Sequence, residues 1–346
     1  MTKMKKEICQ QPVALAGSIK YNMPVLEALA EKLRSSKINC VYLAARGTSD
    51  HAGTYGKYLI ESMIGVPVAL AAPSAVTLYG GKLKLENTLV IGISQSGAAA
   101  DVLEIMKNAK ECGAITLTIT NTLGSPLAEA ADFHLYCNVG LEESVAATKT
   151  FGAQLYLMAY VSAMWAGNDA FLKELAGVPA LMQSVIDRDG EVAELVKRYR
   201  FMTECFMLSR GVNYPLAMEA CLKTQETNYV KAKAYPISDF HHGPFAMIED
   251  GTAVFLYMPD GPALNDSIAM IDKLKGADAD LCIVSDSEEL CKMGNVSFQI
   301  PACGGNDAIA AFAYAVFAQL FACELTQVKG RNPDAPRGLK KVTVTK

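Results

Sequence analysis

The sequence has no large excess of charge of either sign, and in particular no excess of positive charge, which limits the partners that it can bind. Lysine and arginine number 32 against 36 aspartate and glutamate residues, so the formal net charge is -4. A chain without a strong positive field has no general means of holding a nucleic-acid backbone. We therefore expect no nucleic-acid partner, and we expect an anionic substrate to be held by local donors such as the amide groups of a helix N-terminus.

Clustered cysteine and histidine residues are also missing. The 10 cysteines are scattered without a C-x-x-C pair, and the only adjacent histidines are His241 and His242. Zinc sites need several thiolates or imidazoles at close spacing. The pattern predicts reduced cysteines, and we expect neither a metal site nor a cofactor.

The sequence shows no targeting signal, since residues 1–11 are polar, and we see no apolar run near the roughly 20 residues of a membrane span. We therefore expect a cytoplasmic protein with no membrane partner. Hydrophobic residues make up 51% of the 346 residues and charged residues 20%, which is the composition of a chain that buries substantial cores. The length favours about two domains.

Short apolar runs alternate with amphipathic stretches, the pattern of a parallel α/β fold. We expect strands at 40–45, 67–72, 88–93, 115–120, 204–209, 253–258, 281–284 and 296–300. We expect helices at 101–110, 147–165 and 214–229, with a helical connector between the two halves.

An internal repeat indicates that the two halves are related. The run Val41–Gly47 resembles Cys205–Gly211, and each is an apolar strand that ends in Arg-Gly before a helix. This match favours a duplication. Only the first half carries a serine-rich loop after a later strand, so we expect a phosphate site in the first half alone.

The serine-rich loop is Ser94-Gln-Ser96-Gly97, between an apolar strand and a helix. Serine hydroxyls and helix amides can donate to phosphate oxygens, and glycine lets the backbone turn closely around an anion. The alternative is a plain strand-to-helix turn with a serine cap. The turn Gly47-Thr48-Ser49 offers further hydroxyls, and ligands of open α/β sheets bind beyond the carboxyl ends of the strands.

Three other features look ordinary by composition. Lys223 and Glu226 lie three residues apart on a predicted helix, which is typical of a surface ion pair. His241-His242-Gly243-Pro244 reads as a loop. The cationic run that ends in Lys340 and Lys341 reads as a solvated terminus.

The chain resembles the isomerase half of the glucosamine-6-phosphate synthase family, which is built from sugar-isomerase (SIS) domains. The resemblance runs nearly end to end and rests on the segments 6–12, 47–53, 94–97, 119–125, 145–149, 222–226, 242–244 and 336–342. It implies an α/β fold of two tandem SIS domains, each a parallel sheet flanked by helices in a flavodoxin-like, doubly wound arrangement.

The resemblance also suggests boundaries. They are an N-terminal helical segment at 1–35, SIS domain 1 with the phosphosugar site at 36–166, a helical connector at 167–198, the catalytic SIS domain 2 at 199–330 and an active-site tail at 331–346.

The resemblance implies roles for particular residues. It assigns substrate binding to Gly47, Thr48, Ser49, Ser94, Gln95, Ser96 and the backbone near Val145 and Ala147. It makes Glu226 the base that moves a proton between carbons 1 and 2, with Lys223 keeping it ionised, His242 the acid/base for ring opening, and Lys341 the amine of a Schiff base. The chain departs from the family at Ala98-Ala99, where Glu-Thr is usual, and at Ala147, where serine is common.

These assignments imply a phosphosugar isomerase/deaminase acting on glucosamine 6-phosphate and fructose 6-phosphate. Two alternatives stay open: a deglycase for fructosamine 6-phosphates, and a phosphosugar-binding regulator. We expect no glutamine-dependent synthesis, because no glutaminase segment precedes Met1 in this sequence. The resemblance further implies a homodimer in which His242 reaches the site of the opposite subunit. The sequence alone leaves open a monomer whose two halves close on each other.

Overall fold

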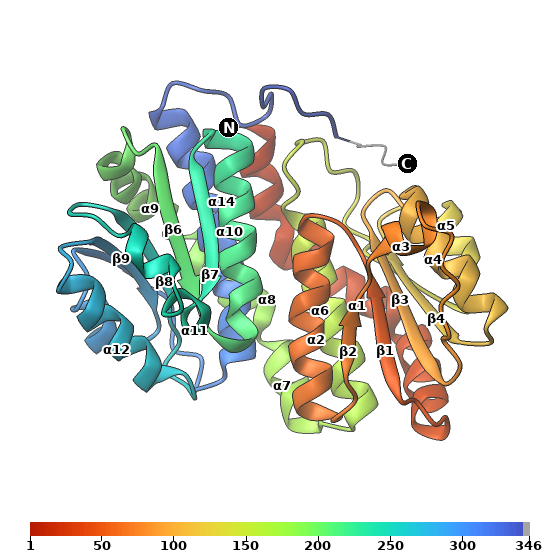
Figure 1. Ribbon diagram of the computed structural model, residues 1–346. Coiled ribbons are helices and arrows are strands. Elements are labelled where there is room, and N and C mark those ends of the chain that lie inside the picture. Colours follow the sequence, from red (N-terminus) through yellow and green to blue (C-terminus); the bar gives the residue numbers. More distant parts are fainter. Residues whose placement is uncertain (342–346) are drawn as a thin grey trace. The chain divides into compact units, whose positions relative to one another are not determined.

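The computed structural model describes residues 1–341, and within them the strands form two parallel sheets of five strands each (Figure 1). The first sheet has the order β2-β1-β3-β4-β5. Its strands are β1 (Cys40–Ala44), β2 (Val68–Leu70), β3 (Thr88–Ser94), β4 (Ile115–Thr120) and β5 (Phe133–Tyr136). This order reverses between β1 and β3, the point at which doubly wound sheets bind their ligands.

The second sheet repeats this topology. Its order is β10-β9-β8-β6-β7, which is the same succession when the strands are numbered from the start of the second half. Its strands are β6 (Glu204–Ser209), β7 (Lys231–Pro236), β8 (Ala253–Tyr257), β9 (Asp280–Ser285) and β10 (Val296–Gln299). The shared order supports the duplication that the Arg-Gly repeat indicates.

The chain divides into two compact units. Of the described residues, the N-terminal unit holds Gln10–Glu142, Lys149–Pro179, Lys340 and Lys341; the C-terminal unit holds Met1–Cys9, Glu143–Thr148 and Ala180–Leu339. Helices of the first half of the chain are α1 (Lys3–Ser35), α2 (Thr48–Met63), α3 (Pro73–Thr77), α4 (Ala100–Glu111), α5 (Pro126–Ala130), α6 (Lys149–Ala166) and α7 (Asp169–Ala176). Those of the second half are α8 (Val178–Ile186), α9 (Asp189–Leu195), η1 (Val196–Tyr199), η2 (Gly211–Asn213), α10 (Tyr214–Asn228), α11 (Ile237–Phe240), η3 (Pro244–Met247), α12 (Leu264–Lys275), α13 (Glu288–Cys291) and α14 (Asp307–Val328).

Each sheet is covered by helices that bury apolar side chains against it. In the N-terminal unit, Val102, Ile105 and Met106 of α4 pack in one cluster with Val90 of β3. In the C-terminal unit, Met270 and Leu274 of α12 are part of the cluster that includes the inner strands. Strands buried on both faces read as continuous apolar runs, which is why the sequence reveals them.

All eight expected strands form, and the two that the sequence did not predict are edge strands. β7 reads Lys-Ala-Lys-Ala-Tyr-Pro and β5 only Phe-His-Leu-Tyr, and each pairs with one neighbour. An edge strand needs little apolar surface and commonly carries lysine. The sequence therefore contains no strong signal for either strand.

The expectation that no apolar run approaches the length of a membrane span is wrong for α14. This helix is long and apolar enough to cross a membrane, and 94% of its most apolar window is buried inside the protein. It packs against α10 and α9, as a core helix does.

Candidate active site

The serine-rich loop follows β3 at the point where the order of the first sheet reverses. Gly97 adopts a left-handed conformation with φ 66°, and its amide donates to the Ser94 carbonyl at 3.2 Å. A Cβ at Gly97 would collide with Ser125 Oγ, so the turn needs glycine. The Gln95 carbonyl accepts from the Asn121 amide at 2.9 Å, which ties the loop to the end of β4. The backbone thus holds Ser94 and Ser96 in a fixed turn.

The second expected loop lies on the neighbouring strand. Gly47 precedes α2 with φ 52°, and its carbonyl accepts from the amide of Asp50 at 2.9 Å. Thr48 and Ser49 occupy the first turn of α2, and Ser49 is buried. Because β1 pairs with β3 in parallel, this turn and the serine-rich loop share the carboxyl edge of one sheet. That is the arrangement expected of a phosphate cradle.

An arginine that the sequence reading did not assign lies at the same edge. Arg46 Nε donates to Asp101 Oδ2 at 2.7 Å, and Asp101 is in the first turn of α4, directly after the serine-rich loop. Burial raises the pKa of the Asp50 carboxyl, and the nearby His51 and Arg46 only partly offset this effect. The Arg-Gly repeat marks Arg46 in the sequence, but by itself it indicates a duplication and assigns no ligand role to the arginine.

In the tail, Lys341 contacts a carboxylate that the sequence reading also missed. Its Nζ lies 2.9 Å from Glu142 Oε2, and the Glu142 side chain is fully buried. Glu142 also accepts from the amide and hydroxyl of Thr150, at 3.1 and 2.7 Å, at the start of α6. The last described residue of the chain is therefore bound to the N-terminal unit, whereas composition suggested a solvated terminus.

In the C-terminal unit, α10 carries a buried ionic triad. Lys223 Nζ lies 2.6 Å from Glu226 Oε2 and 3.4 Å from Glu219 Oε1. Lys223 is fully buried and Glu219 nearly so, while 22% of the Glu226 side chain is exposed. The pair is therefore not the surface ion pair that its spacing suggests. Glu219 is a further missed residue, although positions 219, 223 and 226 share one helical face.

The triad sets the charge of the lysine. Burial by itself lowers the Lys223 pKa, but the two carboxylates raise it more, and the net pKa lies above the ordinary lysine value. Lys223 is thus a buried cation in contact with Glu226. Of the two carboxylates in the triad, Glu226 is the one that is partly exposed.

The end of α10 holds the segment that leads to the tail. Tyr229 is the left-handed residue that ends the helix, with φ 55°, and its hydroxyl accepts from the Arg337 amide at 2.7 Å. The Arg337 and Arg331 guanidinium carbons lie 4.4 and 4.7 Å from the centre of the Tyr229 ring. These cation–π contacts anchor the segment before Lys341 to the helix of Glu226.

The segment Glu143–Thr148 belongs to the C-terminal unit and is held at both ends. The Ser144 hydroxyl donates to Glu7 of α1, and the Thr148 carbonyl accepts from Gln319 of α14 at 3.2 Å. Val145 and Ala147 lie between these anchors and are half-buried. The structure therefore places both residues in a segment that is fixed at its two ends.

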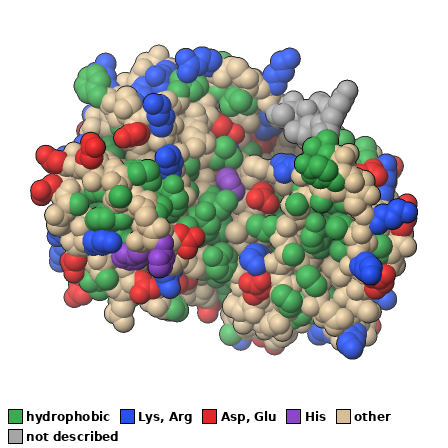
Figure 2. Space-filling model, in the orientation of Figure 1, with side chains coloured by type: hydrophobic (Ala, Val, Ile, Leu, Met, Phe, Trp, Pro, Cys, Tyr) green, Lys and Arg blue, Asp and Glu red, His purple; other side chains and the backbone are tan. Residues whose placement is uncertain are grey.

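His242 lies in an exposed turn after α11, as its Gly-Pro neighbours predict, and its amide donates to the Asp239 carbonyl at 3.0 Å. Figure 2 shows histidine side chains gathered on the surface over α11. Partial burial and the nearby Lys273 lower the pKa of His241. Because Lys273 Nζ lies 3.5 Å from His241 Nδ1, His241 is engaged with a neighbouring cation.

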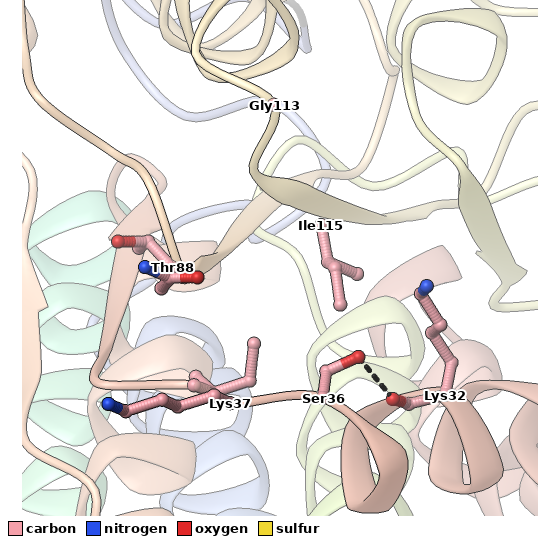
Figure 3. Close-up of a pocket in the computed structure, with 8 residues that line it drawn as sticks. Lys32, Ser36, Lys37, Thr88, Gly113 and Ile115 are labelled. Carbon is pink, nitrogen blue, oxygen red and sulfur yellow. Dashed lines mark hydrogen bonds between the residues drawn. The ribbon is translucent and has the colours of Figure 1, made fainter.

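A cavity of about 280 Å³ lies at the opposite edge of the first sheet (Figure 3). It is lined by Thr88 and Ile115, the first residues of β3 and β4, and by Lys32 and Ser36 at the end of α1. Ligands of parallel α/β sheets bind at the carboxyl ends of the strands, so this cavity is not the candidate site. Among residues 1–341, no three His, Cys, Asp or Glu side chains gather as a metal site requires.

Comparison with known proteins identifies the family. The SIS domain pattern matches residues 32–163 and again residues 203–329, which together cover most of the chain. The chain belongs to the SIS-domain family. The two matched segments contain the two parallel sheets, so the tandem SIS fold predicted from the sequence is confirmed.

Relatives of this SIS-domain protein include a glutamine--fructose-6-phosphate aminotransferase from Thermococcus kodakarensis, 32% identical over 351 aligned positions. The alignment covers 99% of the chain but 58% of that relative, so the chain spans little more than half its length. The C-terminal domain of a glucosamine-fructose-6-phosphate aminotransferase from Francisella tularensis has a TM-score of 0.86 at 25% identity, covering 97% of this chain and 98% of that domain. A glucosamine-6-phosphate deaminase from Thermotoga maritima has a TM-score of 0.78 at 20% identity over 99% and 100% of the two chains, and this likeness shows the fold alone.

Proposed function

We propose that the protein is a phosphosugar isomerase/deaminase that converts glucosamine 6-phosphate and water into fructose 6-phosphate and ammonia. The observation that carries the proposal is the partly exposed Glu226 carboxylate, held 2.6 Å from the buried Lys223 ammonium. A carboxylate held in a fixed position is the group that a carbon-to-carbon proton transfer needs. The names of two relatives, glutamine--fructose-6-phosphate aminotransferase and glucosamine-fructose-6-phosphate aminotransferase, support the same substrate class.

The proposed reaction begins with ring opening. His242 takes the proton from the anomeric hydroxyl and supplies one to the ring oxygen as the bond between carbon 1 and that oxygen breaks, which gives the open-chain aldehyde. Glu226 then removes the proton from carbon 2 while the carbonyl oxygen at carbon 1 gains one. After the abstracted proton has exchanged with solvent, Glu226 delivers a proton to carbon 1 and the amine at carbon 2 becomes an imine. Lys223, 2.6 Å from Glu226 Oε2, holds the carboxylate in place during these steps.

Loss of ammonia follows at carbon 2. Water can add to the imine directly, or the Lys341 amine can add first, expel ammonia and form a Schiff base that water hydrolyses to the ketose. A nucleophilic amine must be uncharged, and Glu142, 2.9 Å from Lys341 Nζ, is the carboxylate in position to accept its proton. We propose that Ser49, Ser94, Gln95 and Ser96 hold the 6-phosphate during these steps, with the backbone near Val145 and Ala147 against the sugar.

The proposal also concerns cofactors, compartment, oligomeric state and binding partners. The chemistry needs acid–base groups and an amine, which the chain supplies, so we propose no metal or organic cofactor. We further propose a cytoplasmic homodimer that binds neither nucleic acid nor membrane. The negative formal charge and the burial of α14 support these last two points.

The test is incubation with glucosamine 6-phosphate in deuterated water. We expect fructose 6-phosphate and ammonium in equal amounts, with one solvent deuteron at carbon 1. Glu226→Gln is expected to bind the sugar phosphate but to exchange no carbon-bound proton, whereas Glu219→Gln, which removes the other carboxylate from Lys223, should still exchange it. Turnover of a fructosamine 6-phosphate carrying an amino acid, but not of glucosamine 6-phosphate, would identify a deglycase. Binding without turnover of either compound would identify a regulator.

A further inference from the structure

Arg46 presents an anchored but partly exposed guanidinium at the carboxyl edge of the first sheet. Its Nε is fixed by Asp101, whose side chain is 3% exposed, while 54% of the Arg46 side chain faces solvent. Within residues 1–341, no second hydrogen bond or ion pair engages this guanidinium. Its two terminal nitrogens are therefore available to a ligand at the carboxyl edge of β1 and β3.

The electrostatics of this edge favour an anion. The N-terminus of α4 carries the positive end of a helix dipole, and a cation placed there is unfavourable unless negative charge accompanies it. Asp101, in the first turn, is one such charge. A phosphate between the Ser94–Gly97 loop and Arg46 would add negative charge and would accept charge-assisted hydrogen bonds from two guanidinium nitrogens.

The second half of the chain contains an equivalent Arg–Asp pair that has no serine-rich loop beside it. Arg210, the counterpart of Arg46 in the Arg-Gly repeat, has its Nε 2.7 Å from Asp266 Oδ2, in the first turn of α12. The contact has the same atoms and length as the Arg46–Asp101 pair, so each pair ties a strand end to a helix start. After β8, however, the loop contains the exposed Asp260 where the first half has serines, and this carboxylate opposes an anion.

The positions that follow the Ser94–Gly97 loop lack a hydroxyl that could donate to a phosphate, which also favours a role for Arg46. Ala99 is the N-cap of α4 and makes no side-chain hydrogen bond to the helix, so positions 98 and 99 offer no hydroxyl to a phosphate. Arg46 reaches the following turn of the same helix. We propose that Arg46 is a ligand of the substrate's 6-phosphate and supplies the donor that Ala98 and Ala99 lack. This inference rests on the proposed phosphosugar function.

Calorimetry with inorganic phosphate and with glucosamine 6-phosphate tests the assignment. Arg46→Gln is expected to weaken both affinities by more than about tenfold, as loss of a charge-assisted donor does. Arg210→Gln is the matched control, because it breaks the same kind of tie, and it should leave phosphate affinity unchanged. Arg46→Lys, which keeps the charge but loses the planar fork, should lie between Arg46→Gln and wild type.

A compensating substitution distinguishes a direct contact of Arg46 with phosphate from a purely structural role of the Arg46–Asp101 pair. Adding Ala99→Thr to Arg46→Gln restores a hydroxyl beside the cradle and should recover affinity, whereas Ala99→Val, of similar shape, should not. Wild-type affinity in Arg46→Gln, or equal losses in Arg46→Gln and Arg210→Gln, would overturn the assignment. If Arg46→Gln binds normally while a Ser94→Ala/Ser96→Ala variant does not, the phosphosugar proposal stands and only the Arg46 role fails. If wild-type protein binds neither compound, both fail.

Discussion

Replacing Lys223 by methionine is expected to destabilise the C-terminal unit strongly, because a buried carboxylate would lose its counter-charge. Glu219 is 1% exposed and lies 3.4 Å from Lys223 Nζ, so water cannot take the place of the lysine. Removing one partner of a buried pair costs about 3–5 kcal/mol. For a unit of this size, about 2–4 °C per kcal/mol gives a drop in melting temperature of about 6–20 °C.

The stability that Lys223 contributes is expected to decrease at high pH. Burial favours loss of the Lys223 proton, but Glu219 and Glu226 outweigh it, so the folded-state pKa lies above the ordinary value of 10.5. A raised lysine pKa contributes stability that is complete below the unfolded value and is lost as pH rises through the folded value. The difference between wild type and Lys223→Met should therefore be constant near neutrality and should narrow above about pH 10.5.

Thermal unfolding followed by circular dichroism at pH 7 measures the effect. The control is the double variant Glu219→Leu/Lys223→Met, which removes the buried pair together and should recover most of the lost stability, since apolar replacements of buried pairs are often neutral. A Lys223→Met melting temperature within about 2 °C of wild type would refute the reasoning, because the carboxylate would then not depend on the lysine.

Three further results are expected. Ser94→Ala/Ser96→Ala removes two charge-assisted donors worth about 1.5–3 kcal/mol each, so glucosamine 6-phosphate should bind more than tenfold more weakly in calorimetry; unchanged affinity would place the phosphate elsewhere. Gly97→Ala combines a φ of 66° with a collision at Ser125 Oγ, so unfolding should cost about 2–4 kcal/mol less, and a wild-type melting curve would contradict the turn geometry. Mixing inactive Glu226→Gln with inactive His242→Ala should restore roughly a quarter of wild-type activity if a homodimer shares its sites, because about half of the dimers are mixed and carry one intact site. A mixture that stays inactive after verified subunit exchange would show that His242 acts within its own subunit.

The sequence by itself determined the fold class and most strands, because strands buried on both faces must be apolar throughout. The runs before Ser94 and Arg210 are such strands, and the Arg-Gly repeat already indicated two related halves. It could not give β5 and β7, whose edge positions leave them with weak patterns. The sequence also predicted the glycine- and serine-containing turn after β3, because the conformation of such a turn depends on the local backbone.

Partnerships between residues distant in the sequence were decided only by the tertiary structure. Lys341 and Glu142 are 199 positions apart and Arg46 and Asp101 are 55 apart, and neither pair has a local pattern. Burial was equally hidden: the spacing of Lys223 and Glu226 is the same on a solvated helix and on one packed against α14. The charge of an isolated side chain follows from its chemistry, but the water removed and the counter-charge supplied around it depend on elements that only folding brings together.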